Sequence, residues 1–268
     1  MNQKIQLFKR GLKHPSLVLG LIDRKLKLTK AGKVSHEGER LVVKDWDSAE
    51  KSNSFVVLAH VHRYLWVQDY LDGGICLDAG CGSGYGTNHL AEKCKMEKII
   101  GIDVDEQAIA YCRKKFQKPC LEFQQMDVTQ MGFPDNYFDN VVSFDVLEHL
   151  DQNGQEKFLF EVARVLKPSG YAYIGCPNGK KIANWKPNKF HLNELTQSQF
   201  EEVVAKRFGE VKVLGQDILL DGVRQQEKQD RDIPNLSISN FTIVENEYMW
   251  GLLSICKRPK KNSLTQLF

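Results

Sequence analysis

The stretch Ile75–Thr87 reads ICLDAGCGSGYGT, and the interpretation of the whole chain starts from it. Its first residues are apolar or small, which is typical of a strand buried on both faces of a sheet. An acid, Asp78, then leads into a loop with glycine at every second position from 80 to 86. Glycine lets the backbone turn sharply and approach a ligand closely. Because residues 85–93 read as a helix, this strand, loop and helix N-terminus predict a nucleotide site.

The spacing of the glycines excludes two common nucleotide motifs. A dinucleotide fingerprint requires G-x-G-x-x-G, but the third glycine would fall at Tyr85 or at Thr87 in the two available registers. A phosphate-binding P-loop requires Gly-Lys-Ser/Thr after the glycines, and that triplet does not follow.

The pattern D-x-G-x-G-x-G from Asp78 to Gly84 resembles the first motif of class I S-adenosylmethionine-dependent methyltransferases. The resemblance implies an α/β, Rossmann-like fold: a seven-stranded, mostly parallel sheet in the order 3-2-1-4-5-7-6, with the seventh strand antiparallel and helices on both faces. It also implies S-adenosyl-L-methionine as cofactor. The segment 37–42 (EGERLV), the sequence His60-Val-His-Arg-Tyr64 and the Gly-Tyr-Gly loop at 84–86 together resemble a subgroup often linked to glycan, polysaccharide or small-molecule O-methylation.

Alternating apolar and helical segments extend this pattern along the chain. We expect helices at residues 54–71, 104–116, 155–166 and 195–208, and strands at 98–102, 121–125, 137–144 and 171–176. Two late strands, 211–218 and 248–257, have no helix between them and are expected to pair as a hairpin. The predicted organisation is an N-terminal arm and lead-in (1–53), a methyltransferase domain (54–259) with an insertion at 219–247, and a tail (260–268).

Composition and charge are those of a soluble globular protein. The seven cysteines include no C-x-x-C pair, and no apolar run reaches the length of a membrane span. These features predict a reduced, cytoplasmic protein. Residues 1–33 carry nine Lys and Arg against one acid, Asp23. Such an arm packs on the domain or, alternatively, makes a peripheral contact with anionic membrane, and nothing in the sequence favours nucleic acid.

Acids or loop starts stand at the expected carboxyl ends of the strands, where open α/β sheets bind ligands. The resemblance implies the following cofactor-binding residues: Arg63, Asp78, Gly80, Gly82, Asp103, Val104, Asp127, Val128 and Phe144. In this interpretation Asp103 accepts hydrogen bonds from the ribose, and Asp127 and Val128 contact the adenine. Asp78 and Phe144 orient the ammonium, and Arg63 binds the carboxylate. The structural alternatives are a helix cap for Asp103 or Asp105 and a turn for Asp127.

Two histidines are candidates for the catalytic base of methyl transfer to a hydroxyl, namely His149 and His191. For each, the alternative is a structural histidine that binds a loop. Asp145, Glu148 and His149 form a D-x-x-E-H group on one expected helix face. A similar cluster binds a divalent metal in quinone-ring O-methyltransferases, but we predict no metal here.

The resulting hypothesis is an S-adenosylmethionine-dependent methyltransferase acting on a hydroxyl of a small molecule or glycan. One alternative is an acceptor of another kind, an amine or a quinone ring. The other is a non-catalytic, cofactor-binding adaptor docked through the basic arm. The sequence leaves the acceptor and the oligomeric state open.

Overall fold

The computed structural model describes residues 46–51, 55–179, 188–220, 223–224, 237–245 and 250–260. The basic arm, most of the insertion and nearly all of the tail predicted from the sequence lie outside these residues. Among the described residues, no helix is long and apolar enough to cross a membrane.

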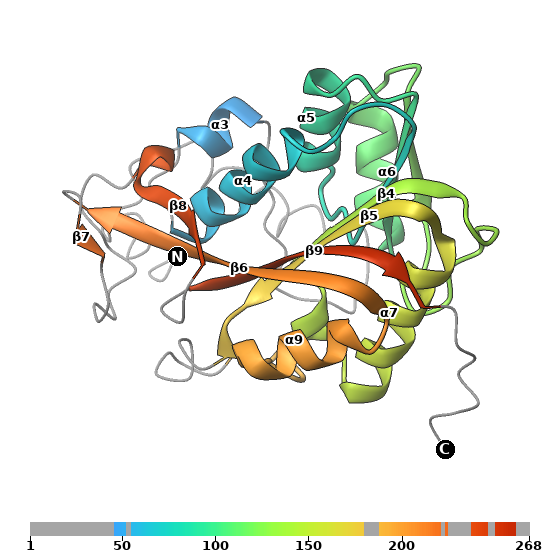
Figure 1. The fold of residues 1–268 in the computed structure, drawn as a ribbon. Coiled ribbons are helices and arrows are strands. Elements are labelled where there is room, and N and C mark those ends of the chain that lie inside the picture. Colours follow the sequence, from blue (N-terminus) through green and yellow to red (C-terminus); the bar gives the residue numbers. More distant parts are fainter. Residues whose placement is uncertain are drawn as a thin grey trace.

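The strands and helices alternate along the chain much as the sequence predicts (Figure 1). The strands are β1 (Ile75–Ala79), β2 (Lys98–Asp103), β3 (Leu121–Gln125), β4 (Phe138–Phe144), β5 (Leu166–Pro177), β6 (Phe208–Leu220), β7 (Val223–Arg224), β8 (Phe241–Val244) and β9 (Gly251–Pro259). The α-helices are α3 (Trp46–Glu50), α4 (Phe55–Gln68), α5 (Tyr85–Lys93), α6 (Glu106–Lys115), α7 (Gln152–Val165) and α9 (Gln197–Ala205). Two short 3-10 helices are η1 (Leu147–His149) and η2 (Ile238–Asn240).

The sheet has the order β3-β2-β1-β4-β5-β9-β6-β7, and β8 also pairs with β6. Strands β1 to β5 are parallel to one another, whereas β9 is antiparallel to both β5 and β6. The predicted hairpin of late strands is therefore confirmed. In the expected order 3-2-1-4-5-7-6, β6 corresponds to strand 6 and β9 to strand 7. The predicted count of seven strands is wrong, because the segment between β6 and β9 adds the short strands β7 and β8.

Helices cover the sheet from two sides, with α4 and α5 above it and α7 and α9 below it in Figure 1. Alternate residues of the strands face the two layers, as a pleated sheet requires. Leu77 packs in the core between the sheet and helices α7 and α9, whereas its neighbour Cys76 packs on the opposite face with α4 and α5. This double burial explains why the central strands are continuously apolar in the sequence.

Two helix starts are fixed by side chains that cap them. Asp105 is the N-cap of α6 and accepts hydrogen bonds from the backbone of Gln107 at 2.8 Å and Ala108 at 3.2 Å. Thr196 and Gln199 form a capping box at the start of α9. Because Asp105 is the cap of α6, the neighbouring acid Asp103 is left for another role.

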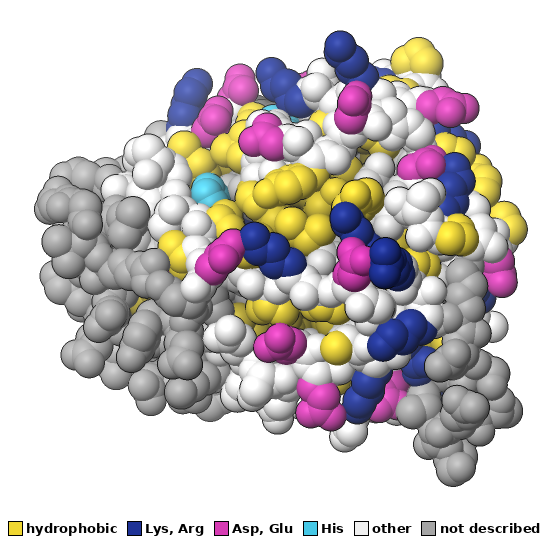
Figure 2. All heavy atoms as spheres, viewed as in Figure 1, with side chains coloured by type: hydrophobic (Ala, Val, Ile, Leu, Met, Phe, Trp, Pro, Cys, Tyr) yellow, Lys and Arg dark blue, Asp and Glu magenta, His cyan; other side chains and the backbone are white. Residues whose placement is uncertain are grey.

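One face of the sheet carries aromatic side chains near the surface. Figure 2 shows hydrophobic side chains gathered where β5, β9 and β6 lie in Figure 1, with charged side chains beside them. The ring of Trp66 lies 6.0 Å from that of Tyr173, and Tyr70 lies 5.7 Å from the same ring. Lys257 places its ammonium 4.8 Å from the ring centroid of Tyr171.

Candidate active site

The carboxyl ends of the parallel strands bring the predicted binding segments to one edge of the sheet. Asp78 on β1 is in register with Gly101 on β2 and with Val142 on β4. Asp103 ends β2 and Phe144 ends β4, so both lie beside the loop that follows β1. The sequence therefore located this edge correctly.

Asp78 lies beneath the glycine loop and is completely buried. Its carboxylate accepts hydrogen bonds from Thr87 at 2.7 Å and from Tyr64 at 3.1 and 3.2 Å. Burial raises the pKa of Asp78 to about 6, although these hydrogen bonds oppose the shift. Asp78 thus joins α4 and α5 under the loop, and contact with a cofactor ammonium stays a prediction.

The glycine loop is packed on one side and open on the other. Gly80, Gly82 and Gly84 all have positive φ angles, of 85°, 55° and 74°. A Cβ atom at Gly80 would lie 2.3 Å from Val146, and one at Gly84 would lie 2.6 Å from the sulfur of Cys112. A Cβ atom at Gly82 would meet no described atom within 4 Å. The loop therefore offers its backbone to a ligand at Gly82.

Asp103 connects the end of β2 to this open part of the loop. Its carboxylate accepts a hydrogen bond from the backbone N–H of Gly82 at 2.9 Å and another from that of Asp105 at 3.0 Å. Asp103 is 7% exposed, whereas the next residue, Val104, is 54% exposed. An acid and an exposed apolar side chain thus lie together beside the glycine loop, which fits a ribose and a base.

The two residues predicted to contact the adenine, Asp127 and Val128, follow the end of β3. Val128 is buried and Asp127 is exposed. One oxygen of Asp127, Oδ1, accepts hydrogen bonds from the backbone and the hydroxyl of Thr129, both at 2.8 Å. This is the turn that the sequence offered as the alternative for Asp127, and the adenine contact stays a prediction.

Arg63 is held in a buried network that the sequence did not reveal. Its guanidinium forms an ion pair with Asp145 and donates from Nε to Gln216 at 2.9 Å. Gln216, on β6, also donates to the carbonyl of Ala59 at 2.9 Å. Nη1 and Nε of Arg63 are thus already engaged within the protein, and contact with a cofactor carboxylate stays a prediction.

Asp145 is the centre of this network and lies just past β4. It has a positive φ of 55°, which directs the chain away from the predicted helix. Its carboxylate also lies 2.9 Å from Nε2 of His60, whose Nδ1 lies 2.8 Å from the hydroxyl of Tyr85. Burial opposes ionisation of Asp145, but the charges of Arg63 and His60 outweigh burial and lower its pKa below the ordinary range.

The two histidines predicted to be catalytic lie side by side. Their rings meet edge to face with centroids 5.1 Å apart, although they are 42 positions apart in the sequence. Nδ1 of His149 lies 3.2 Å from the carbonyl of Phe190, and Nδ1 of His191 lies 2.6 Å from the carboxylate of Glu194. The loop of His191 is fastened to η1, because the backbone N–H of Leu192 donates to the carbonyl of Glu148 at 2.7 Å.

The D-x-x-E-H group does not share a helix face, and that prediction is wrong. Residues 147–149 form the 3-10 helix η1, and Asp145 faces Arg63 and His60 instead. Glu148 turns inward and is 2% exposed. Burial, followed by the nearby charge of Asp145, raises the pKa of Glu148 well above its usual range.

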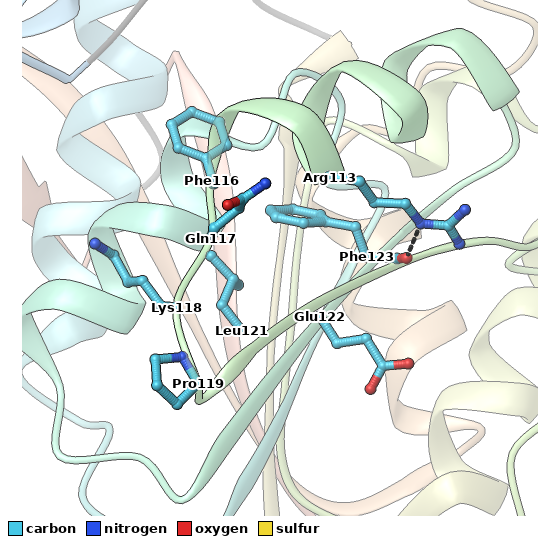
Figure 3. Close-up of a pocket in the computed structure, with 8 residues that line it drawn as sticks. All are labelled: Arg113, Phe116, Gln117, Lys118, Pro119, Leu121, Glu122 and Phe123. Atoms are coloured by element: carbon cyan, nitrogen blue, oxygen red, sulfur yellow. Dashed lines mark hydrogen bonds between the residues drawn. The ribbon is translucent and has the colours of Figure 1, made fainter.

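A cavity of about 500 Å³ lies elsewhere, between the end of α6 and the start of β3 (Figure 3). Arg113, Phe116 and Phe123 are among its lining residues, and Arg113 donates to the carbonyl of Phe123 at 2.7 Å. Most of its lining residues precede β3 or begin it, whereas the predicted site lies at the strands' carboxyl ends. The strand tips therefore stay the candidate site.

Comparison with known proteins identifies the central part of the chain. Residues 77–174 match the family model described as "Methyltransferase domain". This segment therefore resembles a methyltransferase domain, and it makes up less than half of the chain. Within it lie all the predicted site residues except Arg63 and His191.

Relatives with similar sequences are named as methyltransferases. A Mycobacterium tuberculosis protein named "Probable S-adenosylmethionine-dependent methyltransferase" is 35% identical over 131 residues, which cover 48% of this chain and 46% of that protein. The "Phthiotriol/phenolphthiotriol dimycocerosates methyltransferase" of the same organism is 30% identical over 156 residues, covering 56% of this chain and 57% of the relative. The chain thus spans about half the length of the curated relatives it matches.

Solved structures support the fold. A Thermotoga maritima protein described as a "SAM-dependent methyltransferase, possible histamine N-methyltransferase" has a TM-score of 0.58 and 16% identity, covering 90% of this chain and 98% of that one. A methyltransferase from Archaeoglobus fulgidus has a TM-score of 0.55 and 21% identity, covering 76% and 93% of the two chains. The fold is therefore the Rossmann-like fold of class I methyltransferases, with two extra short strands.

Proposed function

We propose that this protein transfers a methyl group from S-adenosyl-L-methionine to a hydroxyl of a small molecule or glycan. The observation that carries the proposal is the meeting of two features at one sheet edge. The first is the open glycine loop hydrogen-bonded to Asp103, and the second is the histidine pair at the tip of the neighbouring strand β4.

The cofactor is S-adenosyl-L-methionine, which relatives matching the methyltransferase segment carry in their names. The site fits this molecule, because Gly82 leaves space for a ligand and Asp103 supplies a carboxylate beside that space. When bound, the cofactor supplies a methyl group on a sulfonium, and the bond from carbon to sulfur breaks as the acceptor oxygen attacks, leaving an uncharged thioether.

The residues of the chain position the acceptor and take its proton. The Glu194 carboxylate accepts from Nδ1 of His191, so the lone pair of that ring lies on Nε2, where it can receive a proton from a hydroxyl. The carbonyl of Phe190 fixes His149 in the same way. Correct alignment of acceptor and methyl group supplies a further several kcal/mol.

A hydroxyl acceptor is favoured over an amine because the site holds bases. An ammonium acceptor must lose a proton before it can attack, but nearby carboxylates would stabilise its charged form and raise its pKa. One relative is named for a triol-derived acceptor, which is in line with a hydroxyl. The adaptor alternative would keep the cofactor pocket without turnover.

Isotope transfer tests the proposal. The full-length protein is incubated with methyl-labelled S-adenosylmethionine and extracts of its source cell, and the labelled product is identified. We expect an alkali-stable methyl ether, and we expect alanine at both His149 and His191 to abolish it while S-adenosylhomocysteine still binds. Label on nitrogen would refute the hydroxyl acceptor, and cofactor binding without any labelled product would favour the adaptor.

A further inference from the structure

We propose that Glu148, His149 and His191 form a binding site for a divalent transition-metal ion such as Zn²⁺. Each residue offers one ligand atom, and these atoms lie within 4.8 Å of one another. In tetrahedral zinc sites, neighbouring ligand atoms are roughly 3.3 Å apart, so small side-chain rotations would close the group around an ion. This set differs from the D-x-x-E-H group of the sequence, because Asp145 is outside it and His191 is inside it.

Glu148 provides the first argument for an ion. Its carboxylate is almost completely buried, and its Oε2 atom has no hydrogen-bond partner among the described residues. A buried carboxylate oxygen without a partner is costly. Nε2 of His149 is 4.0 Å from Oε1, beyond hydrogen-bond distance. A cation at this point would compensate the carboxylate.

The orientation of the two imidazoles provides the second argument. Phe190 presents a carbonyl, which can only accept, so Nδ1 of His149 carries the proton. Glu194 accepts in the same way from Nδ1 of His191 at 2.6 Å. Each lone pair therefore lies on Nε2. Metal-binding histidines are characteristically fixed by such an acceptor on the other nitrogen, either a carbonyl or a carboxylate.

The charges around the cluster admit a cation. Arg63 lies near Glu148, but its guanidinium is already paired with Asp145. Two carboxylates, those of Asp145 and Glu148, thus face this one guanidinium, and a third, that of Glu194, lies beside His191. Two imidazole nitrogens and one carboxylate oxygen suit Zn²⁺ and similar ions, whereas Mg²⁺ prefers oxygen ligands.

Three protein ligands leave a coordination position open. If the proposed function holds, that position would take the acceptor oxygen. Because the ion would occupy Nε2 of both histidines, it would replace them as the group that activates the acceptor: it would lower the pKa of the hydroxyl, whose proton would pass to solvent. The acceptor would then be a compound with a hydroxyl able to coordinate a metal. This last step rests on the proposed function, whereas the metal site itself does not.

Metal binding is measured directly on the full-length protein after removal of metals with a chelator. Calorimetric titration with Zn²⁺ and with Mg²⁺ should show one tight Zn²⁺ site and much weaker Mg²⁺ binding. Co²⁺ should give visible absorption bands that report nitrogen ligands. His191→Asn should weaken Zn²⁺ binding at least about a hundredfold, and Glu194→Gln, which only orients the ring, about 10- to 100-fold.

His62→Asn is the matched control, because His62 on α4 contacts Gln216 and Phe241 and lies outside the cluster. It should leave the Zn²⁺ affinity and the Co²⁺ spectrum unchanged. Binding of S-adenosylhomocysteine to each variant checks the fold and the cofactor site independently of the metal.

Equal Zn²⁺ affinities and Co²⁺ spectra for wild type, His191→Asn and His62→Asn would overturn the metal site, as would the absence of a tight site. Metal binding without methyl transfer would leave the site standing and refute the proposed function instead.

Discussion

Replacing Gly82 by alanine should weaken cofactor binding while costing no more stability than the same replacement at Gly73. Both glycines have positive φ, 55° and 75°, and a Cβ atom on either would meet no described atom within 4 Å. The left-handed backbone costs an L-residue about 1–2 kcal/mol, so each variant should lose that amount. This loss lowers the melting temperature by about 2–4 °C per kcal/mol for a chain of this size.

The two positions differ in what their open side faces. Gly73 precedes β1, at the amino end of the strand, whereas Gly82 lies over Asp103 at the carboxyl end. A methyl group at position 82 would enter the space proposed for the cofactor. Overpacking of this kind costs about 1–3 kcal/mol, which corresponds to an affinity loss of about 5- to 150-fold.

Thermal unfolding and calorimetric titration with S-adenosylhomocysteine separate the two effects. We expect similar melting temperatures for Gly82→Ala and Gly73→Ala, with wild-type affinity only for Gly73→Ala. Gly84→Ala is a third variant, expected to be the least stable because its Cβ would lie 2.6 Å from Cys112. Wild-type affinity in Gly82→Ala would refute the placement of the cofactor at this loop.

Three further predictions concern the acids at the strand tips. Asp103→Ala should weaken S-adenosylhomocysteine binding tenfold or more, about 1.4 kcal/mol, and an unchanged calorimetric affinity would remove its ribose role. The pKa of Asp78 is raised from 3.8 to about 6, so the folded state holds a proton that the unfolded state has lost, and this group makes stability fall as pH rises between about 4 and 6. The free energy of unfolding of Asp78→Asn should therefore rise by roughly 3 kcal/mol relative to that of wild type as pH increases across this window. A difference between the two proteins that does not change with pH, measured by urea unfolding, would contradict this. Asp145→Asn should cost about 3 kcal/mol, because it leaves the buried Arg63 without its partner; asparagine tolerates the positive φ, so unchanged denaturant stability would show that the pair contributes little.

The sequence was informative wherever a feature depends on residues close together in the chain. Asp78 and Asp103 each end an apolar run, and parallel strands place such ends at one edge. The capping box of Thr196 and Gln199 is also local, and the structure contains it. These features needed only the periodicity of the chain and the position of its glycines.

The features that the sequence missed depend on distant partners. Gln216 is 153 positions from Arg63, and no local pattern links them. The positive φ of Asp145 turns one short segment, so Asp145 and Glu148 face different neighbours although a helix would have aligned them. The extra strands β7 and β8 lie in a polar segment without clear alternation. His60 and Tyr85 stood in the motifs that suggested the family, but nothing in their spacing showed that they contact each other.

The contacts of Gln216 limit which segments of this protein can be exchanged with those of another. This one amide, on the strand that leads into the segment after β6, holds both Arg63 and the backbone of α4. The segment after β6 is therefore not an independent module. Exchanging that segment together with the end of β6 would remove the contacts of Gln216 with Arg63 and with α4, leaving Arg63 only its ion pair with Asp145. A chimera would therefore need a glutamine at this place to keep the network intact.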